Sequence, residues 1–475
     1  MGRLPPRQGT VLGRPRTAQE DVRMRPMASM RPRGRITVLA ASFSLASLAG
    51  LSLGSGDALA QTTLTIATVN NGDMVVMQRL SAKFEQQHPD IKLRWVVLEE
   101  NVLRQRVTTD IATKAGQFDI MTIGNYEVPI WAKQGWLEPM ENLPASYDVD
   151  DLLKPVREGL TYENKLYALP FYGESAMTYY RKDLFQKAGI TMPEQPTYDQ
   201  VKDAAAKITD KPGQVFGICL RGKPGWGENM AYVTSLVTTF GGQWFDKSWK
   251  ATIDTPEWHK ALTYYNDVLK NYGPPGATSN GFNENLALTA GGRCGMWIDS
   301  TVAAGLLYDT RQSQVADKIA FAPIPVGDFK GGPTWLWSWN LGIPASSKQK
   351  EAAKTFTTWA TSKEYIQLVA QENGWVAVPP GTRRSTYENA DYQKAAPFAS
   401  FVLKAIETAN PNGDTKNPRP YTGAQFVAIP EFQGIGTQVG QTVAGTLTGQ
   451  TSIDAALKAA QSATERTMRQ AGYGR

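Results

Sequence analysis

The stretch that decides the fold runs from Leu64 to Ile123 and reads LTIATVNNGDMVVMQRLSAKFEQQHPDIKLRWVVLEENVLRQRVTTDIATKAGQFDIMTI. It alternates β-rich runs with amphipathic helical runs, in the order 64–69, 74–87, 92–97, 101–114 and 118–123. This β-α-β-α-β order predicts an α/β fold with a parallel sheet and helices on both of its faces.

Two loops of this stretch follow the carboxyl ends of predicted strands, which is where open α/β sheets bind their ligands. Asn71 and Asp73 follow the first predicted strand, and Asn125 and Tyr126 follow the third. We therefore expect these four residues at a binding site. A helix cap explains Asp73 equally well, and a turn explains Asn125 and Tyr126.

Residues 1–60 have the three parts of a secretory signal. Arginines at 31, 33 and 35 precede an uncharged run at 36–56, and Ala58-Leu59-Ala60 is a small-x-small cleavage site. We expect a cleaved signal peptide and a periplasmic mature chain that begins at Gln61. The leader is long for a signal, so a methionine between 24 and 30 is an alternative start. A membrane anchor is the other reading, but Ser, Thr and Gly dilute the apolar run.

The formal net charge of +6 belongs to this leader. The first 60 residues hold nine of the 50 Lys and Arg residues but only three of the 44 acidic ones, so the remainder is balanced. A nucleic-acid binder needs a basic stripe that neutralises phosphates, and no such stripe is evident. The two histidines, His88 and His259, lie in unrelated segments, so the sequence also predicts no metal site.

The chain has two cysteines, Cys219 and Cys294. Export to an oxidising compartment makes a disulfide between them possible. Two buried free thiols are the alternative, because the sequence does not fix the distance between the two residues.

Motifs further along the chain resemble those of the sugar-binding proteins of bacterial ABC importers. They are ENKLYALP at 163–170, YYRKDLF at 179–185, GRCGMWID at 292–299, WNLGIP at 339–344 and VPPGTR at 378–383. The ordered series covers nearly the whole mature chain, although Asn164 and Cys294 stand where the family usually has Gly and Ala. Two further stretches, LRGKPGWGEN at 220–229 and WLWSW at 335–339, look most like those of the mannitol and sorbitol binders.

The resemblance implies a two-lobed periplasmic-binding-protein fold like that of maltose-binding protein. The expected crossings between lobes lie near Phe171, Trp297 and Ile343. Lobe one would comprise 61–170 plus 298–342, and lobe two 171–297 plus 343–475. Such a protein is a monomer without cofactor or catalysis, closes around a polyol or small sugar, and delivers it to the membrane permease.

A polyol offers hydroxyls, each both donor and acceptor, and weakly apolar C–H faces. Its site therefore needs fork-shaped polar side chains and aromatic faces. The further candidates of these types are Tyr172, Glu174, Arg221, Trp226, Asp299, Trp335, Trp337, Trp375 and Arg383. Glu174 and Asp299 lie near predicted crossings. In an extended 335–339 segment the three tryptophans share one face.

Structural roles explain many of these candidates as well. The tryptophans could fill the core or anchor a loop, and the charged residues could form salt bridges. A glycoside hydrolase is a rival interpretation in which two of the residues Glu174, Glu228 and Asp299 supply the acid pair, but nothing in their spacing fixes the required separation. A surface adhesin would need repeats or a large apolar patch, and neither is evident.

Overall fold

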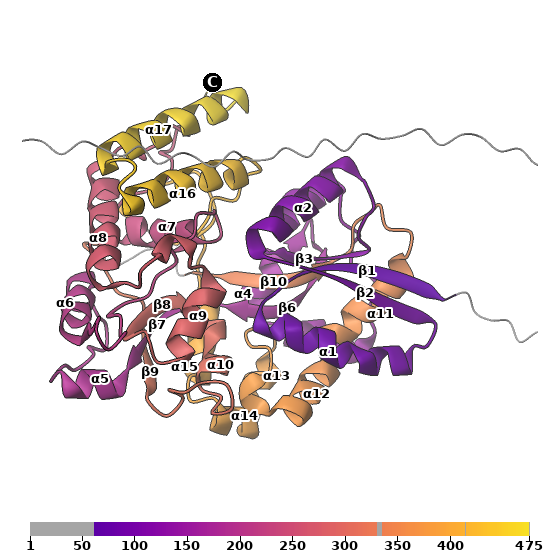
Figure 1. Cartoon of the computed structure of the whole chain (residues 1–475). Coiled ribbons are helices and arrows are strands. Elements are labelled where there is room, and N and C mark those ends of the chain that lie inside the picture. Colours follow the sequence, from indigo (N-terminus) through magenta and orange to yellow (C-terminus); the bar gives the residue numbers. More distant parts are fainter. Residues whose placement is uncertain (1–60, 330–334, 414, 475) are drawn as a thin grey trace, which may run out of the picture. The chain divides into compact units, whose positions relative to one another are not determined.

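The N-terminal elements follow the predicted alternation. The computed structural model describes residues 61–329, 335–413 and 415–474, so the predicted signal peptide lies outside the described residues. The elements in order are β1 (Thr62–Val69), α1 (Gly72–Gln87), β2 (Ile91–Leu98), α2 (Glu100–Thr113) and β3 (Ile120–Gly124). β1 pairs in parallel with β2 and β3, and α1 and α2 cover opposite faces of the sheet (Figure 1). The predicted parallel unit is therefore confirmed.

Two later strands complete this sheet and bring distant residues together. The strand order is β2-β1-β3-β10-β6, where β6 spans Ala168–Glu174 and β10 spans Trp337–Gly342. β10 runs antiparallel to β3 and β6, and its register puts Trp337 opposite Glu174 and Trp339 opposite Tyr172. Because opposite residues of a ladder project from the same face, these four side chains lie side by side.

A second sheet has the order β8-β7-β9, in which both pairings are antiparallel. Its strands are β7 (Ala176–Arg181), β8 (Met296–Ser300) and β9 (Ile319–Ala322). Only Ser175 separates β6 of the first sheet from β7 of the second, close to the crossing expected near Phe171. The chain returns to the first sheet between β9 and β10.

This pairing corrects the predicted lobe ranges at three elements. Residues 298–322 were expected with lobe one, but β8 and β9 pair with β7 because they complete its hydrogen-bond ladder on both edges. Helix α11 (Lys350–Ala360) was expected with lobe two, but it packs against β1 and β6. The rest of the predicted ranges remains a prediction.

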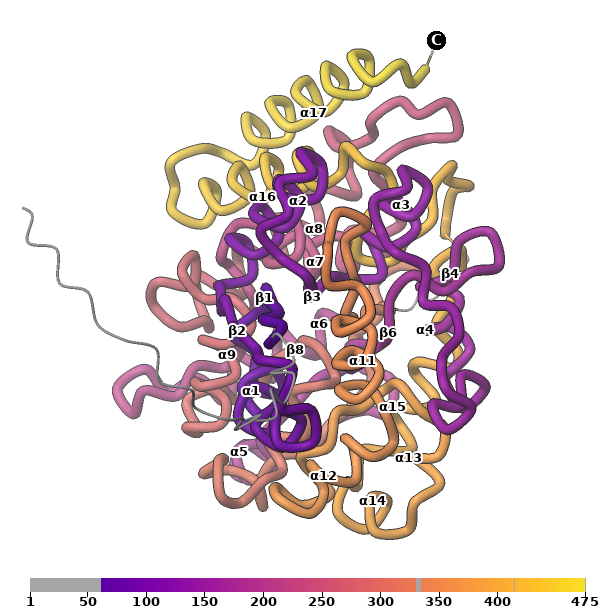
Figure 2. Tube along the Cα trace, turned by 90° about the vertical axis from the view of Figure 1, so that its right-hand side faces the viewer, coloured from indigo at the N-terminus to yellow at the C-terminus, as the bar shows by residue number. Residues whose placement is uncertain are grey.

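The other helices pack around these sheets. The helices that lie between β3 and β10 in the sequence are α3 (Glu127–Lys133), α4 (Lys154–Gly159), α5 (Lys182–Lys187), α6 (Tyr198–Ile208), α7 (Asn229–Thr239), α8 (Pro256–Tyr272), α9 (Phe282–Ala290) and α10 (Ala304–Leu307). A short hairpin, β4 (Thr161–Tyr162) and β5 (Lys165–Leu166), precedes β6. After α11 come α12 (Lys363–Asn373), α13 (Arg384–Glu388), α14 (Ala390–Ala395), α15 (Ala399–Glu407), α16 (Phe432–Thr448) and α17 (Ile453–Gln470). Figure 2 shows α16 beside α17, and both contact α8.

Cys219 and Cys294 are joined by a disulfide bond, with their Cα atoms 5.9 Å apart. The Cys219 N–H also donates a hydrogen bond to the Met296 carbonyl, 2.8 Å away. The segment that carries Arg221 is therefore fastened to β8, which carries Asp299.

Candidate functional site

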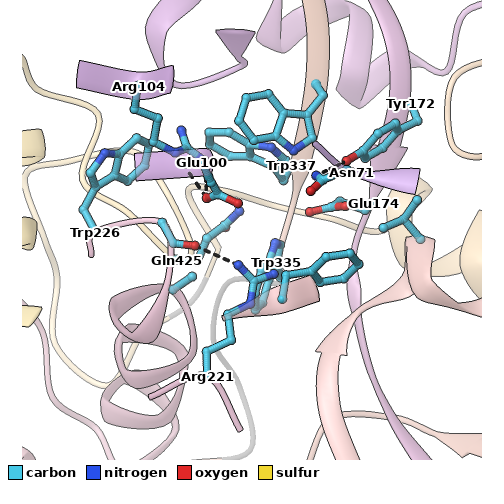
Figure 3. A pocket seen from close by; sticks show the side chains of 15 residues that line it. Asn71, Glu100, Arg104, Tyr172, Glu174, Arg221, Trp226, Trp335, Trp337 and Gln425 are labelled. Atoms are coloured by element: carbon cyan, nitrogen blue, oxygen red, sulfur yellow. Dashed lines mark hydrogen bonds and ion pairs between the residues drawn. The ribbon is translucent and has the colours of Figure 1, made fainter. Parts of the chain in front are cut away.

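A narrow cavity of about 20 Å³ lies where the first sheet meets the segment 221–231 and α9 (Figure 3). Its walls combine aromatic rings with buried polar groups. The lining residues are Asn71, Glu100, Arg104, Tyr172, Glu174, Arg221, Trp226, Gly227, Ala231, Phe282, Val302, Trp335, Trp337, Trp339 and Gln425. A concave site of this composition suits a small molecule that has both apolar and hydroxyl surfaces.

Arg104 of α2 organises the aromatic wall. Its guanidinium carbon lies 4.2 Å from the ring centre of Trp226 and 4.7 Å from those of Trp337 and Trp339. Its Nη2 donates to Glu100 at 2.9 Å, and its Nη1 donates to Glu127 at 3.3 Å. Attraction between a cation and ring faces, together with two carboxylates that fix the cation, holds the three indoles in place.

Gly124 makes room for one of these indoles. A Cβ atom at this position would overlap the ring of Trp337 and would lie 2.8 Å from a carboxylate oxygen of Glu127. The Gly124 N–H donates to that same carboxylate at 2.9 Å. The end of β3 therefore needs a residue without a side chain for the wall to form.

Arg221 and Asp299 form a buried pair at the cavity. Arg221 Nε donates to Asp299 at 2.9 Å and Nη2 donates at 2.7 Å, while Nη1 donates to the Gly227 carbonyl at 2.9 Å. The Trp297 indole N–H also donates to Asp299, at 3.1 Å. Arg221 lines the cavity, whereas Asp299 lies behind it and positions the guanidinium.

Two buried carboxyl groups near Arg221 have strongly raised pKa values. Burial raises the pKa of Glu174 to about 8, although a hydrogen bond with Ser300 and the charge of Arg221 oppose the shift. Burial, reinforced by Glu100, raises the pKa of Glu228 to about 8 as well. Raised pKa values favour the protonated form of these carboxyl groups, and a protonated carboxyl can donate as well as accept a hydrogen bond.

Asn71 occupies the N-cap position of α1, but its side chain makes no capping hydrogen bond. Its Nδ2 donates instead to the Tyr172 hydroxyl, 2.9 Å away in the cavity wall, and its Oδ1 accepts from Asn283 at 3.3 Å. The predicted loop after the first strand thus reaches the cavity through Asn71. The cap proposed for Asp73 is wrong, because Asp73 lies in the first turn of the helix.

Besides Asp299, five predicted site residues do not line this cavity. Asp73 lines an adjoining cavity beyond Asn71, and Asn125 lines a separate one, where its Oδ1 accepts from the Ser338 N–H at 3.2 Å. Tyr126 packs its ring 4.8 Å from that of Trp226 and supports it from behind. Trp375 is half-buried in a short 3-10 helix. Arg383 is fully buried against Tyr147 and donates to the Thr361 carbonyl, which is a structural role.

The lining also contains charged, amide and aromatic residues that sequence reasoning missed, namely Glu100, Arg104, Phe282 and Gln425. Glu100 begins α2 and Arg104 lies one turn further along it. The helix follows the end of β2, and a strand end is a signal that could have pointed to both residues. Phe282 begins α9, and Gln425 lies in the irregular segment before α16. Neither position carries a local sequence signal, because each reaches the cavity only through tertiary packing.

In the described ranges no three or more His, Cys, Asp or Glu residues are arranged to hold a metal ion. Among the same residues no helix combines the length and the apolar character that crossing a bilayer requires.

Two α/β sheets joined by a short crossing, with a concave aromatic and polar site beside it, define a protein that binds a small solute. The family model described as bacterial extracellular solute-binding protein matches residues 70–367, and the chain belongs to this family. The predicted resemblance and the two-lobed fold class are thereby confirmed.

Individual relatives agree over most of the chain. The mannitol-binding protein of Pseudomonas aeruginosa is 58% identical over 86% of this chain and 94% of its own. A solute-binding protein of Agrobacterium vitis S4, solved with bound D-mannitol, is 59% identical with a TM-score of 0.86 and covers 87% of this chain and 100% of its own. A solute-binding protein of Agrobacterium radiobacter K84 in complex with ribitol is 26% identical with a TM-score of 0.76, covering 86% of this chain and 99% of its own.

Proposed function

We propose that this chain is the binding component of an ABC importer and that its ligand is an acyclic polyol, D-mannitol or a close relative. The observation that carries the proposal is the likeness to the Agrobacterium vitis protein that holds D-mannitol, at 59% identity and a TM-score of 0.86. The ribitol complex of a more distant relative supports the wider class of acyclic polyols.

The chemistry of the cavity supports the same ligand class. The indoles of Trp226, Trp337 and Trp339 line the cavity and offer apolar surface for the C–H groups of an extended carbon chain. The carboxyl group of Glu174 can donate or accept a hydrogen bond.

Several features of the proposal follow from the class. We expect the two lobes to close around the ligand by a hinge, and the closed form to be what the membrane permease recognises. We also expect export to the periplasm through the leader at 1–60, action as a monomer, and no catalytic turnover. The pairing of β8 and β9 with β7 supports a lobe boundary between β9 and β10.

A thermal-shift screen of the mature chain tests the ligand class. Bound ligand at about 100 times its dissociation constant stabilises a protein by about 2.7 kcal/mol. Hexitols and pentitols should raise the melting temperature, whereas maltose and other disaccharides should not. Stabilisation by disaccharides or monosaccharides alone would identify a sugar binder of the same family. Hydrolysis of a glycoside during the incubation would support the rival hydrolase reading instead.

A further inference from the structure

Most polar groups in the cavity wall already have partners within the protein. Arg104 donates to Glu100 and Glu127, and Arg221 donates to Asp299 and to the backbone of Gly227. Groups engaged in this way shape the cavity, but they have few hydrogen bonds left for a ligand.

Two polar atoms of the wall differ from these. Trp335 Nε1 and Gln425 Oε1 are buried and have no hydrogen-bond partner among the described residues. Trp335 is 5% exposed and Gln425 is 3% exposed, and both side chains line the cavity. A buried donor or acceptor without a partner costs about 1–3 kcal/mol, so such groups normally indicate a missing partner.

The orientation of the Gln425 amide is fixed by its other end. Its Nε2 donates to the Leu336 carbonyl at 2.8 Å, which requires a donor at that position and leaves Oε1 as the free acceptor. Leu336 follows Trp335 in the chain, so the free donor and the free acceptor belong to one part of the wall (Figure 3). A donor and an acceptor together match the two capacities of hydroxyl groups.

We propose that Trp335 and Gln425 determine the specificity of the site: the indole N–H of Trp335 donates to a ligand hydroxyl, and the amide oxygen of Gln425 accepts from a ligand hydroxyl. The proposal rests on the proposed polyol function and adds the two residues that recognise particular hydroxyls. A ligand that lacks the matching hydroxyl leaves a buried group unpaired, so it binds more weakly.

The test measures binding by titration calorimetry for the wild type, Trp335→Phe, Gln425→Met and the double variant. The ligands are D-mannitol and the deoxyhexitols that lack one hydroxyl at carbon 1, 2 or 3. Trp258→Phe is the control, because the buried Trp258 also has an indole N–H, but this one already donates to the Gln243 carbonyl at 2.9 Å, outside the cavity. Circular dichroism checks that each variant is folded.

Each cavity variant should bind D-mannitol about 5- to 150-fold more weakly than the wild type, the range that corresponds to one unpaired buried group. For one deoxyhexitol per variant, the substitution should cause little further loss, because its partner hydroxyl is already missing. Such non-additivity separates a direct contact from a change in folding.

Folded variants that bind D-mannitol as tightly as the wild type would overturn the proposal. Equal losses with every deoxyhexitol would also overturn it, because they would indicate a general structural effect. A wild type that binds no polyol at all would instead contradict the proposed function, so the two failures are distinguishable.

Discussion

At the scale of single residues, the site depends on charges that are buried but paired. Arg104 touches three indoles and two carboxylates, and Arg221 is held by Asp299. A guanidinium group presents a rigid planar fork, which can satisfy two acids and still stack on rings, whereas an ammonium group cannot. The aromatic wall is therefore a consequence of buried electrostatics as much as of apolar packing.

Replacing Arg104 tests this dependence. Arg104→Lys retains the charge but loses the planar group over the indoles of Trp226, Trp337 and Trp339, so these rings should lose their fixed positions. We expect the dissociation constant for D-mannitol to rise about tenfold or more, equivalent to about 1.4 kcal/mol, in titration calorimetry. Arg106→Lys, at an exposed position of the same helix, is the control and should bind normally. Equal affinities for the two variants would contradict the assigned role.

Glu174 should make the stability of the ligand-free protein depend on pH. Burial raises the pKa of Glu174 from its ordinary value of 4.5 to about 8, so the folded state binds a proton that the unfolded state releases between these values. The contribution of Glu174 to stability therefore falls as pH rises through this window. Glu174→Gln removes the titration. Its melting temperature relative to the wild type should be higher at pH 8.5 than at pH 5.5, measured without ligand. A difference that does not change with pH would contradict the shifted pKa.

At the scale of elements, the N-terminal strands and helices could be predicted because their periodicity is local. Helix α1 was expected at 74–87 and spans Gly72–Gln87, and β2 was expected at 92–97 and spans Ile91–Leu98. The insertion of β10 between β3 and β6 could not be predicted in this way, because antiparallel pairing across more than a hundred residues leaves no local pattern.

The candidate site was predictable to a similar extent. Asn71 follows a predicted strand, and Trp335 and Trp337 alternate along a predicted extended segment, so a pattern pointed to each of them. Gln425 lies in an irregular segment and reaches the cavity by tertiary packing alone. Arg383 belongs to a motif of the family, yet its guanidinium is buried against Tyr147. A motif does not distinguish a ligand contact from a structural contact.

The junction of β3 and β10 gives a test at this scale. Gly124→Ala places a Cβ where the ring of Trp337 lies, so either the ring or the strand must shift. Overpacking of this kind costs about 1–3 kcal/mol, and the displaced indole should also narrow the cavity. We expect a lower melting temperature. We also expect at least tenfold weaker binding of D-mannitol, which corresponds to a loss of about 1.4 kcal/mol in binding free energy. Gly72→Ala is the control, because a Cβ there meets no atom within 4 Å. If both variants bind alike, the close approach has no functional role.

The disulfide bond gives a second test at the scale of elements, because it joins two segments of the chain. The bond between Cys219 and Cys294 ties the segment before Arg221 to β8, and 75 residues separate its ends. Removing a native disulfide from a small secreted domain typically costs about 2–5 kcal/mol, and this larger chain should lose stability in the same direction. Cys219→Ala combined with Cys294→Ala should lower the melting temperature, and weaker polyol binding should accompany it. Reductant should reproduce the effect in the wild type and leave the double variant unchanged. Equal melting temperatures for the double variant and the wild type would contradict a stabilising role of the bond.

At the scale of the whole molecule, contacts between the first sheet's helices and the 221–229 segment hold the cavity shut. Lys223 Nζ lies 2.6 Å from Glu99 at the N-cap of α2, and Asn101 Nδ2 donates to the Pro224 carbonyl at 3.2 Å. Asn283 of α9 donates to Asn71 at the start of α1. Several such contacts surround the cavity, so in the proposed hinge motion they would break together when the ligand is released.

The proposed closure predicts a kinetic effect for Lys223→Gln. This partly exposed pair is worth about 0.2–1 kcal/mol, and in the proposed closure it joins surfaces that separate when the protein opens. Losing it should therefore raise the dissociation rate of D-mannitol by about 1.5- to 5-fold, while the association rate stays nearly constant. Stopped-flow fluorescence of the cavity tryptophans measures both rates. Lys260→Gln is the matched control, because Lys260 pairs with the exposed Asp328 at 2.6 Å, away from these contacts. A smaller radius of gyration on adding D-mannitol, measured by X-ray scattering, should accompany binding in both variants. An unchanged radius in the wild type would mean that the ligand binds without closure, and the Lys223–Glu99 pair would then have no reason to control release.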